Sequence, residues 1–303
     1  CTEEEYSEFY KKVFHDYNDS LFHIHINADY PLNFKGILYF PKPSHEYQNL
    51  DGEIKLYYNR VFVADNIKEV IPEYLLMLKG VIDCPDLPLN VSRSYLQTNS
   101  YVSKVSAHIV KKVCDKINSL FNTEREKFEG MYDDLKVFLE YACLKDEKFY
   151  DRIKSSLLFK SVSGNYKTLE NCLENNEEKK IYYANDIEQQ SVYINMFKNE
   201  NIDVVIMDKV LDNQFISLLE YKNDGVKFLR VDASSDALKT DSEGKEDEAL
   251  EKLFREVSGR ENLKVTLSAL KDKTVPAVLN ISEEARRFND MLKMYGMYNG
   301  KDM

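Results

Sequence analysis

The stretch LFHIHINADYPLNFKGILYF, residues 21–40, decides the fold of the first part of the chain. Its beginning alternates between apolar and polar residues, which is typical of a strand with one buried and one exposed face. The exposed face would carry His23 and His25 as a solvated pair. The end of the stretch, residues 34–40, predicts a second strand. Further strands are expected at 53–58 and at 61–64.

Helices are expected on both sides of these strands in the sequence. Thr2 and Glu5 have the spacing of a capping box, and an apolar helical period follows them. A helix is expected over residues 68–79, with Gly80 as its stop. A long amphipathic helix should run over residues 102–127, because its apolar side chains recur with the helical period. Shorter helices should follow at 132–144 and 146–157.

The second half of the chain predicts another α/β unit, beginning near residue 180. A strand at 181–184, a helix at 187–198 and a buried strand at 204–207 form a short βαβ segment, which should be parallel and right-handed. A polar, charged segment at 234–247 is the best candidate for a domain boundary. Beyond it we expect a helix at 248–257, strands at 265–270 and 277–281, and a helix from residue 282.

Together these patterns predict an α/β protein of mixed α+β character. It should consist of two αβα layered units joined by a helical connector and followed by a partial α/β C-terminal domain. The expected domains are a large α/β unit at 1–122, the connector at 123–160, a small α/β unit at 161–242 and the partial domain at 243–303. Because the chain begins with Cys1 rather than Met, we expect it to be a piece of a longer protein.

Composition narrows the class of protein. The 303 residues are 43% hydrophobic and 31% charged, with a mean hydropathy of -0.50, which predicts a soluble protein with real cores. No apolar run is long enough to cross a membrane, and no secretion signal is visible. The net charge of -11 argues against nucleic-acid binding. The five scattered cysteines favour a reducing compartment, so a cytoplasmic location is expected.

The run LPLNVSRSYLQ, residues 87–97, is the main candidate for a functional site. Proline at position 88 keeps the approach extended, and Ser92 is placed to cap a helix. Arg93 and Gln97 would then lie on one face near a helix N-terminus, where donors and the helix dipole favour an anion. The segment therefore predicts an arginine presented to a negative group. The alternative is an arginine that pairs with a surface carboxylate.

Other candidate sites are weaker. His23 and His25 could share a metal ion, but two ligands do not make a site and no third is apparent, so no metal is expected. Cys84 lacks an obvious histidine partner and is expected to be a passive thiol. No phosphate-binding glycine motif, nucleophile elbow or zinc-protease motif is present in the sequence.

The run 87–97 resembles the catalytic loop of the middle domain of the heat-shock protein 90 chaperones. Other segments resemble this family in the same order: EEY at 4–6, FYK at 9–11, GILYFPK at 36–42, LY at 56–57, RVFV at 60–63, IPEYL at 71–75, KGVID at 79–83 and TVPAV at 274–278. The chain is most similar to the bacterial branch, because it has no long acidic linker. The resemblance implies a middle domain followed by the start of a C-terminal dimerisation domain.

The resemblance also assigns roles to residues. Arg93 matches the arginine that reaches the ATP γ-phosphate, Gln97 matches the loop glutamine, and Asn90 matches an asparagine that positions the loop. Phe62 matches a phenylalanine in the patch that receives the N-terminal domain, although it could equally be an ordinary core residue on a strand. The implied client-binding residues are Phe215, Met291, Met294 and Tyr295; burial in a core is the alternative for the last three.

The implied function is that of an ATP-dependent chaperone that assists the folding of client proteins. ATP with magnesium would be bound mainly by an N-terminal domain absent from this chain, with no cofactor within the chain itself, which alone should not hydrolyse ATP. The implied partners are client proteins, that N-terminal ATPase domain and a second subunit, although this piece should be mostly monomeric. The alternative is a non-enzymatic, acidic interaction scaffold whose loop arginine only pairs with a carboxylate.

Overall fold

The computed structural model describes residues 1–43, 52–66, 70–87, 100–233, 238–240, 245–260, 263–271, 277–279 and 287–288. The chain divides into two compact units, residues 1–157 and 158–303. The boundary falls near the end of the segment expected to be a helical connector. The α/β fold class predicted from the sequence is confirmed in both units.

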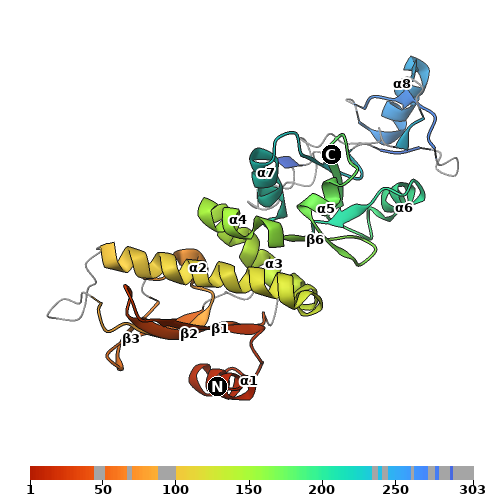
Figure 1. The fold of residues 1–303 in the computed structure, drawn as a ribbon. Helices are drawn as coiled ribbons and strands as arrows, with labels where there is room; N and C mark the ends of the chain where they lie inside the picture. Colours follow the sequence, from red (N-terminus) through yellow and green to blue (C-terminus); the bar gives the residue numbers. More distant parts are fainter. Residues whose placement is uncertain are drawn as a thin grey trace. The chain divides into compact units, whose positions relative to one another are not determined.

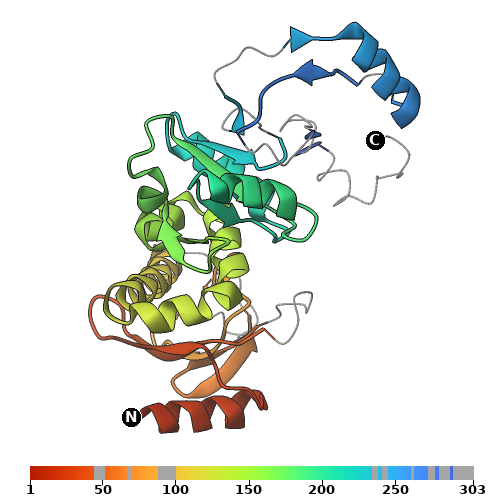
Figure 2. The same cartoon turned by 90° about the vertical axis from the view of Figure 1, so that its right-hand side faces the viewer.

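The first unit is built on a five-stranded mixed sheet in the order β1-β2-β5-β3-β4. Its strands are β1 (Phe22–Ala28), β2 (Phe34–Phe40), β3 (Glu53–Tyr58), β4 (Val61–Asp65) and β5 (Lys79–Asp83). Only the β3–β5 pair is parallel, and β1 and β4 form the two edges. The alternation in β1 buries Phe22, Ile24 and Ile26, as the sequence predicts. Figures 1 and 2 show helix α1 on one face of this sheet and α2 on the other.

Helix α1 (Glu3–Phe14) begins at the predicted capping box. Thr2 Oγ1 accepts from the amide of Glu5, and the carboxylate of Glu5 accepts from the amide of Thr2. Tyr10 is fully buried against Tyr39 of β2, with ring centroids 5.0 Å apart. The helix therefore covers the sheet face that carries the odd-numbered residues of β2.

The histidines of β1 lie beneath this helix. The ring of Tyr6 stacks on His23 with 3.8 Å between centroids, and Tyr6 Oη lies 2.8 Å from His25 Nδ1. His25 remains exposed, but His23 is half-buried, so the prediction of a fully solvated pair is wrong for His23. The sequence pattern fixed which face the pair occupies, whereas the docking of α1 decides how much water reaches it.

The opposite face is covered by helices. In α2 (Ser100–Thr123) the whole predicted apolar stripe is buried: Val102, Val105, Ile109, Val113, Ile117 and Leu120. Helices α3 (Arg125–Lys145) and α4 (Glu147–Ile153) follow it. Asp146 caps α4 by accepting from the amides of Lys148 and Phe149, and also accepts from Tyr74 Oη at 2.6 Å. This carboxylate joins the helical layer to the short 3-10 turn η1 (Glu73–Leu75).

The helix expected over residues 68–79 is not formed in the described part of that range. Pro72 is extended, a single 3-10 turn follows it, and strand β5 begins at Lys79. Gly80 is a site of close packing rather than a helix stop, because a Cβ there would lie 2.6 Å from Leu38 Cδ2 and 2.7 Å from Ile37 O. The apolar spacing was compatible with a helix, but Pro72 interrupts it, and β2 and β3 take up the residues from Lys79 onward as a strand between them.

The second unit contains a three-stranded parallel sheet in the order β10-β8-β9. Its strands are β8 (Lys180–Ala184), β9 (Val204–Ile206) and β10 (Lys227–Arg230), with α6 (Ser191–Asn199) and α7 (Asp212–Lys222) as the crossover helices. The predicted βαβ segment is confirmed as β8–α6–β9. Before it lie the hairpin of β6 (Leu158–Lys160) and β7 (Tyr166–Thr168) and helix α5 (Leu169–Leu173).

The described C-terminal part holds β11 (Lys245–Glu246), α8 (Glu248–Ser258) and β12 (Thr266–Leu267). β11 and β12 pair antiparallel, and α8 ends at Gly259 in the left-handed conformation with φ 68°. The strand expected at 277–281 is not a strand over its described residues, 277–279. In the described ranges of the chain, every helix is too short or too polar to cross a membrane.

Candidate functional site

The hairpin of β3 and β4 is bonded to the end of β5, the strand after which the predicted catalytic loop follows in the sequence. Its turn residues, Asn59 and Arg60, both have positive φ values, 48° and 66°, which match the tight turn of a two-residue hairpin. The amide of Arg60 donates to Asp83 Oδ2 at 3.1 Å, at the end of β5. The amide of Cys84 in turn donates to Tyr57 O at 3.0 Å. The hairpin is thus tied to the strand that leads into the loop.

Phe62 lies on β4, at the edge of the sheet, and is 50% exposed. Its ring meets that of Tyr57 edge to face, with 5.7 Å between centroids. The neighbouring Val61 is 51% exposed. Because neighbouring residues of a strand point to opposite faces, Val61 and Phe62 are exposed separately. A half-exposed phenylalanine on an edge strand is more typical of a contact surface than of core packing.

The described residues that flank the loop are well anchored. Leu87 is 4% exposed, and Cys84 is fully buried at the N-terminal side of the loop. On the C-terminal side, Tyr101 Oη lies 3.7 Å from Cys84 Sγ and donates to Asn33 O at 3.4 Å. Burial raises the pKa of the Cys84 thiol, so it is protonated at neutral pH and its passive role fits the prediction. Both ends of the loop therefore start from packed positions.

Asn90, Arg93 and Gln97, the predicted catalytic residues, lie outside the described residues. So do Met291, Met294 and Tyr295 of the predicted client-binding set. Their roles stay predictions.

Phe215, also predicted to contact clients, is on α7 and is 2% exposed. It is part of the core of the second unit. Direct contact with a client would require this side chain to leave that core.

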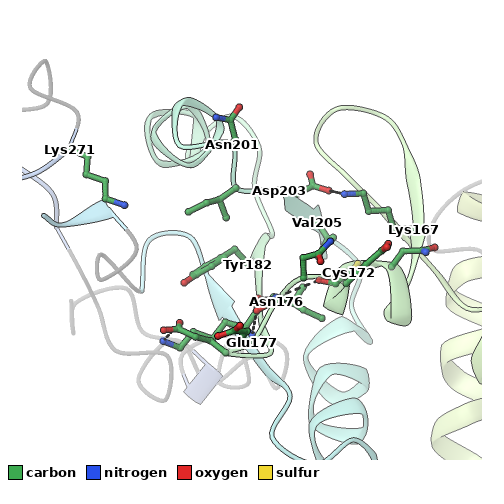
Figure 3. Close-up of a pocket in the computed structure, with 16 residues that line it drawn as sticks. Lys167, Cys172, Asn176, Glu177, Tyr182, Asn201, Asp203, Val205 and Lys271 are labelled. Carbon is green, nitrogen blue, oxygen red and sulfur yellow. Dashed lines mark hydrogen bonds and ion pairs between the residues drawn. The ribbon is translucent and has the colours of Figure 1, made fainter. Parts of the chain in front are cut away.

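Figure 3 shows a hollow of about 660 Å³ in the second unit. Some of the residues that line it are paired with one another. Lys167 pairs with Asp203, and the side chain of Asn176 donates to Lys180 O at 2.7 Å. Burial raises the pKa of Cys172 in this hollow to about 11. Sequence reasoning did not find this hollow, because residues from four separate segments line it: 167–182, 201–203, 205 and 271.

The hollow offers little chemistry. Each of the three lysines that line it, Lys167, Lys180 and Lys271, is paired with a carboxylate, and the Cys172 thiol is protonated at neutral pH. Within the described ranges, no group of three or more His, Cys, Asp or Glu side chains could hold a metal ion, and this includes the surroundings of His23 and His25. The β3–β4 hairpin therefore remains the better candidate for a functional surface.

Comparison with known proteins places this geometry in a family. The family model described as "Hsp90 protein" matches residues 1–290. The chain is 37% identical over 309 residues to the chaperone protein HtpG of Bacteroides thetaiotaomicron. This alignment covers 96% of this chain and 45% of that protein. It is 40% identical over 241 residues to HtpG of Porphyromonas gingivalis, covering 77% of this chain and 35% of that protein.

A solved structure supports the same assignment. The middle domain of a putative heat shock protein of Plasmodium falciparum superposes with a TM-score of 0.60 at 28% identity, covering 77% of this chain and 96% of that domain.

The fold and the sequence therefore identify this chain as the middle region of a chaperone-family protein. The chain belongs to the Hsp90 family, in its bacterial type, so the resemblance seen in the sequence is confirmed. It spans about 45% of the length of the Bacteroides relative.

Proposed function

We propose that this chain is the middle part of an ATP-dependent chaperone that assists the folding of client proteins. In this proposal the β3–β4 hairpin receives the nucleotide-binding domain, and the neighbouring loop delivers Arg93 to the ATP γ-phosphate. The observation that carries the proposal is the half-exposed Phe62 on a hairpin that is hydrogen-bonded to the end of β5, the strand after which the loop follows in the sequence. Docking on the hairpin and placement of the loop would then be mechanically linked.

Arginine suits the proposed role because its guanidinium is always charged and can donate to two phosphate oxygens at once. Closure of the two domains would exclude water and strengthen that contact. Gln97 would add an amide donor four residues away, and Asn90 would hold the loop in shape. Hydrolysis itself depends on the nucleotide pocket of the other domain, so this chain alone should be inactive.

ATP with magnesium is the cofactor that the family implies. In this proposal the nucleotide-binding domain holds ATP and magnesium, and this chain contributes the arginine donor that stabilises charge on the phosphate.

The other partners are proposed on weaker grounds. Met291, Met294 and Tyr295 would contact clients, and Phe215 would do so only if α7 loosened. We propose the domain limits expected from the sequence, 1–122, 123–160, 161–242 and 243–303, as the functional division. The whole protein would act as a homodimer in the cytoplasm, and this piece would be mostly monomeric.

Rescue of ATP hydrolysis tests the proposal. The chain is mixed with the separately purified nucleotide-binding domain of the Bacteroides thetaiotaomicron relative, and turnover is compared with that of each part alone. We expect turnover to rise only in the mixture. Phe62→Ala should increase the chain concentration needed for half of the effect without changing the rate at saturation. The matched control is Phe9→Ala, which removes a 37% exposed phenylalanine of the same unit from helix α1.

A mixture no more active than the nucleotide-binding domain alone would exclude the proposed ATPase role. The acidic interaction scaffold would then be the better description. An equal effect of Phe62→Ala and Phe9→Ala would remove the hairpin from the docking surface.

A further inference from the structure

Side chains on the α1 face of the first unit's sheet form rows that cross the strands, because residues paired directly across neighbouring strands point to the same face. The first row is His23, Tyr39, Lys79 and Glu53. The second row is His25, Ile37, Val81, Lys55 and Asp65. The third row, called the open row below, is Asn27, Lys35, Asp83, Tyr57 and Phe62.

Helix α1 packs on the first two rows. Its Tyr6 stacks on His23 and bonds to His25, which belong to the first and the second row. Ile37 and Val81 of the second row pack against the apolar cluster of α1. Within the described ranges, no hydrogen bond, ion pair or ring contact joins α1 to the open row. The contacts of α1 therefore end one row short of this end of the sheet.

The open row is aromatic at one end and polar at the other. Tyr57 and Phe62 meet edge to face on β3 and β4, and Phe62 is 50% exposed. Lys35 on β2 and Asn27 on β1 are also exposed. Since neighbouring strands lie about 4.8 Å apart, a row across all strands of this sheet is about 19 Å long. The polar and the aromatic end can therefore contact one partner together.

Lys35 keeps its positive charge available to a partner. The residue opposite it is Asp83, but Asp83 Oδ2 accepts from the amide of Arg60 at 3.1 Å. Among the ion pairs of the described residues, none includes Lys35 or Arg60. Both side chains are exposed, on a chain whose net charge is -11. The open row therefore fits a surface that offers a carboxylate beside an apolar group.

The size of the open row indicates what kind of partner occupies it. A stable complex between free proteins buries about 800 Å² on each partner, and a row one side chain wide offers less. A domain tethered to the same chain needs less area, because its effective concentration can reach the millimolar range. The chain spans 45% of the length of the Bacteroides relative, so a protein of that length has other domains to supply. A second copy docked about a two-fold axis would bring like charges together.

We infer that the open row continues the docking surface of the hairpin across the sheet, with Lys35 as the contact to a carboxylate of the nucleotide-binding domain. The inference rests on the proposed function for the identity of that domain. Phe62 would supply the apolar anchor at one edge of the sheet. Lys35 would set the orientation of the docked domain, because only one orientation brings a carboxylate to β2 while an apolar group covers β4.

A binding titration tests the row without using ATP hydrolysis. The nucleotide-binding domain of the Bacteroides thetaiotaomicron relative is labelled with ¹⁵N, loaded with a non-hydrolysable ATP analogue and titrated with the 303-residue chain. Its amide chemical shifts report even weak binding. Lys35→Glu should raise the Kd on the order of 10-fold, because it removes an attraction and adds a repulsion. Lys35→Gln should raise it by a smaller factor, and added salt should weaken the parent more than Lys35→Gln.

Lys104→Glu is the matched control. Lys104 is an exposed lysine of α2, which covers the opposite face of the sheet (Figures 1 and 2). This variant changes the net charge by the same amount as Lys35→Glu, so any effect of overall charge appears in both. The Kd should stay close to that of the parent. The melting temperatures of all variants should match the parent, because an exposed lysine contributes little to stability.

Equal binding by the parent and Lys35→Glu would overturn the inference. So would an equal effect of Lys104→Glu, or a parent chain that does not bind. Turnover in the mixture separates this result from the proposed function. Lys35-dependent binding without any gain in turnover would keep the docking row and remove the ATPase role. A gain in turnover that needs Phe62 but is unchanged in Lys35→Glu would keep the proposed function and remove the row.

Discussion

Replacement of Asp16 should destabilise the first unit, because its carboxylate accepts three hydrogen bonds in a partly buried position. Both of its oxygens are used: Oδ2 accepts from Tyr10 Oη and from Lys79 Nζ, each at 2.7 Å, and Oδ1 accepts from the amide of Asn18 at 3.1 Å. The carboxylate thereby joins the fully buried Tyr10 of α1 to strand β5. Asparagine has one oxygen, so Asp16→Asn must turn one of these acceptor positions into a donor.

The expected cost follows from burial. Removing one partner of a fully buried ion pair costs about 3–5 kcal/mol, and a surface pair is worth about 0–1 kcal/mol. The side chains of Asp16 and Lys79 are 19% and 20% exposed. We therefore expect Asp16→Asn to lower the free energy of unfolding by about 2 kcal/mol, since the amide oxygen can still accept from Tyr10 and Lys79 while the charge and the bond from Asn18 are lost.

Asp19→Asn is the control in the same segment. Asp19 pairs with Lys11 at 2.8 Å, nearly the same distance, but its side chain is 70% exposed and that of Lys11 is 41% exposed. Its replacement should cost less than about 0.5 kcal/mol. Urea unfolding of the parent and both variants at neutral pH measures the difference.

The pH dependence gives an independent check. Burial tends to raise the pKa of Asp16, but hydrogen bonds from Lys79 and Tyr10 lower it below 3.8. A carboxylate with a lowered folded pKa stabilises the protein above its unfolded value and loses that effect as pH falls through the folded pKa. The gap between parent and Asp16→Asn should therefore shrink below about pH 4. Equal costs for Asp16→Asn and Asp19→Asn would refute the argument from burial.

Three further predictions concern the proposed site and the histidines. In the ATPase mixture, Arg93→Ala should lower turnover on the order of 10- to 1000-fold with little change in melting temperature. Arg93→Lys should not restore turnover, because a single point charge cannot make the bidentate contact. Normal turnover in Arg93→Ala would remove Arg93 from the mechanism. Phe62→Ala should cost about 1 kcal/mol of stability, against about 3–5 kcal/mol for Phe34→Ala, because Phe34 is fully buried and Phe62 is half exposed; equal costs would place Phe62 in the core. Burial lowers the pKa of His23 and of His108 below 6.5, so on acidification the unfolded chain binds protons before the folded chain does. The free energy of unfolding should therefore fall as the pH drops below 6.5, and urea midpoints measured at two pH values would show this. A urea midpoint that does not change with pH would contradict it.

Local patterns were enough to predict much of the fold. The capping box at Thr2, the strand at 22–26 and the apolar stripe of α2 depend on spacings of two to four residues, and the structure confirms them. The parallel βαβ unit was also predicted, because a helix between two short strands leaves few other arrangements. The segments that resemble the Hsp90 family identified the class of protein from the sequence alone.

Tertiary structure decided the features that depend on distant neighbours. Residues 79–83 became a central strand because β2 and β3 offer free edges on both sides, and the spacing of apolar residues could not reveal those edges. Phe62 is exposed because β4 lies at the edge of the sheet, and Phe215 is buried because α7 packs into a core. Either aromatic could have been core or surface from its sequence context.

The pairing of Glu220 with Arg287 shows the same limit most clearly. The two residues lie 67 positions apart, on a helix and in a segment with no local signal that links them. Sequence patterns report periodicity within a few turns, because burial on one face of a helix or strand repeats at a fixed interval. Which charge pairs with which depends on the packing of whole elements. The sequence alone therefore determined the family and most of the elements, and the tertiary structure determined the contacts between them.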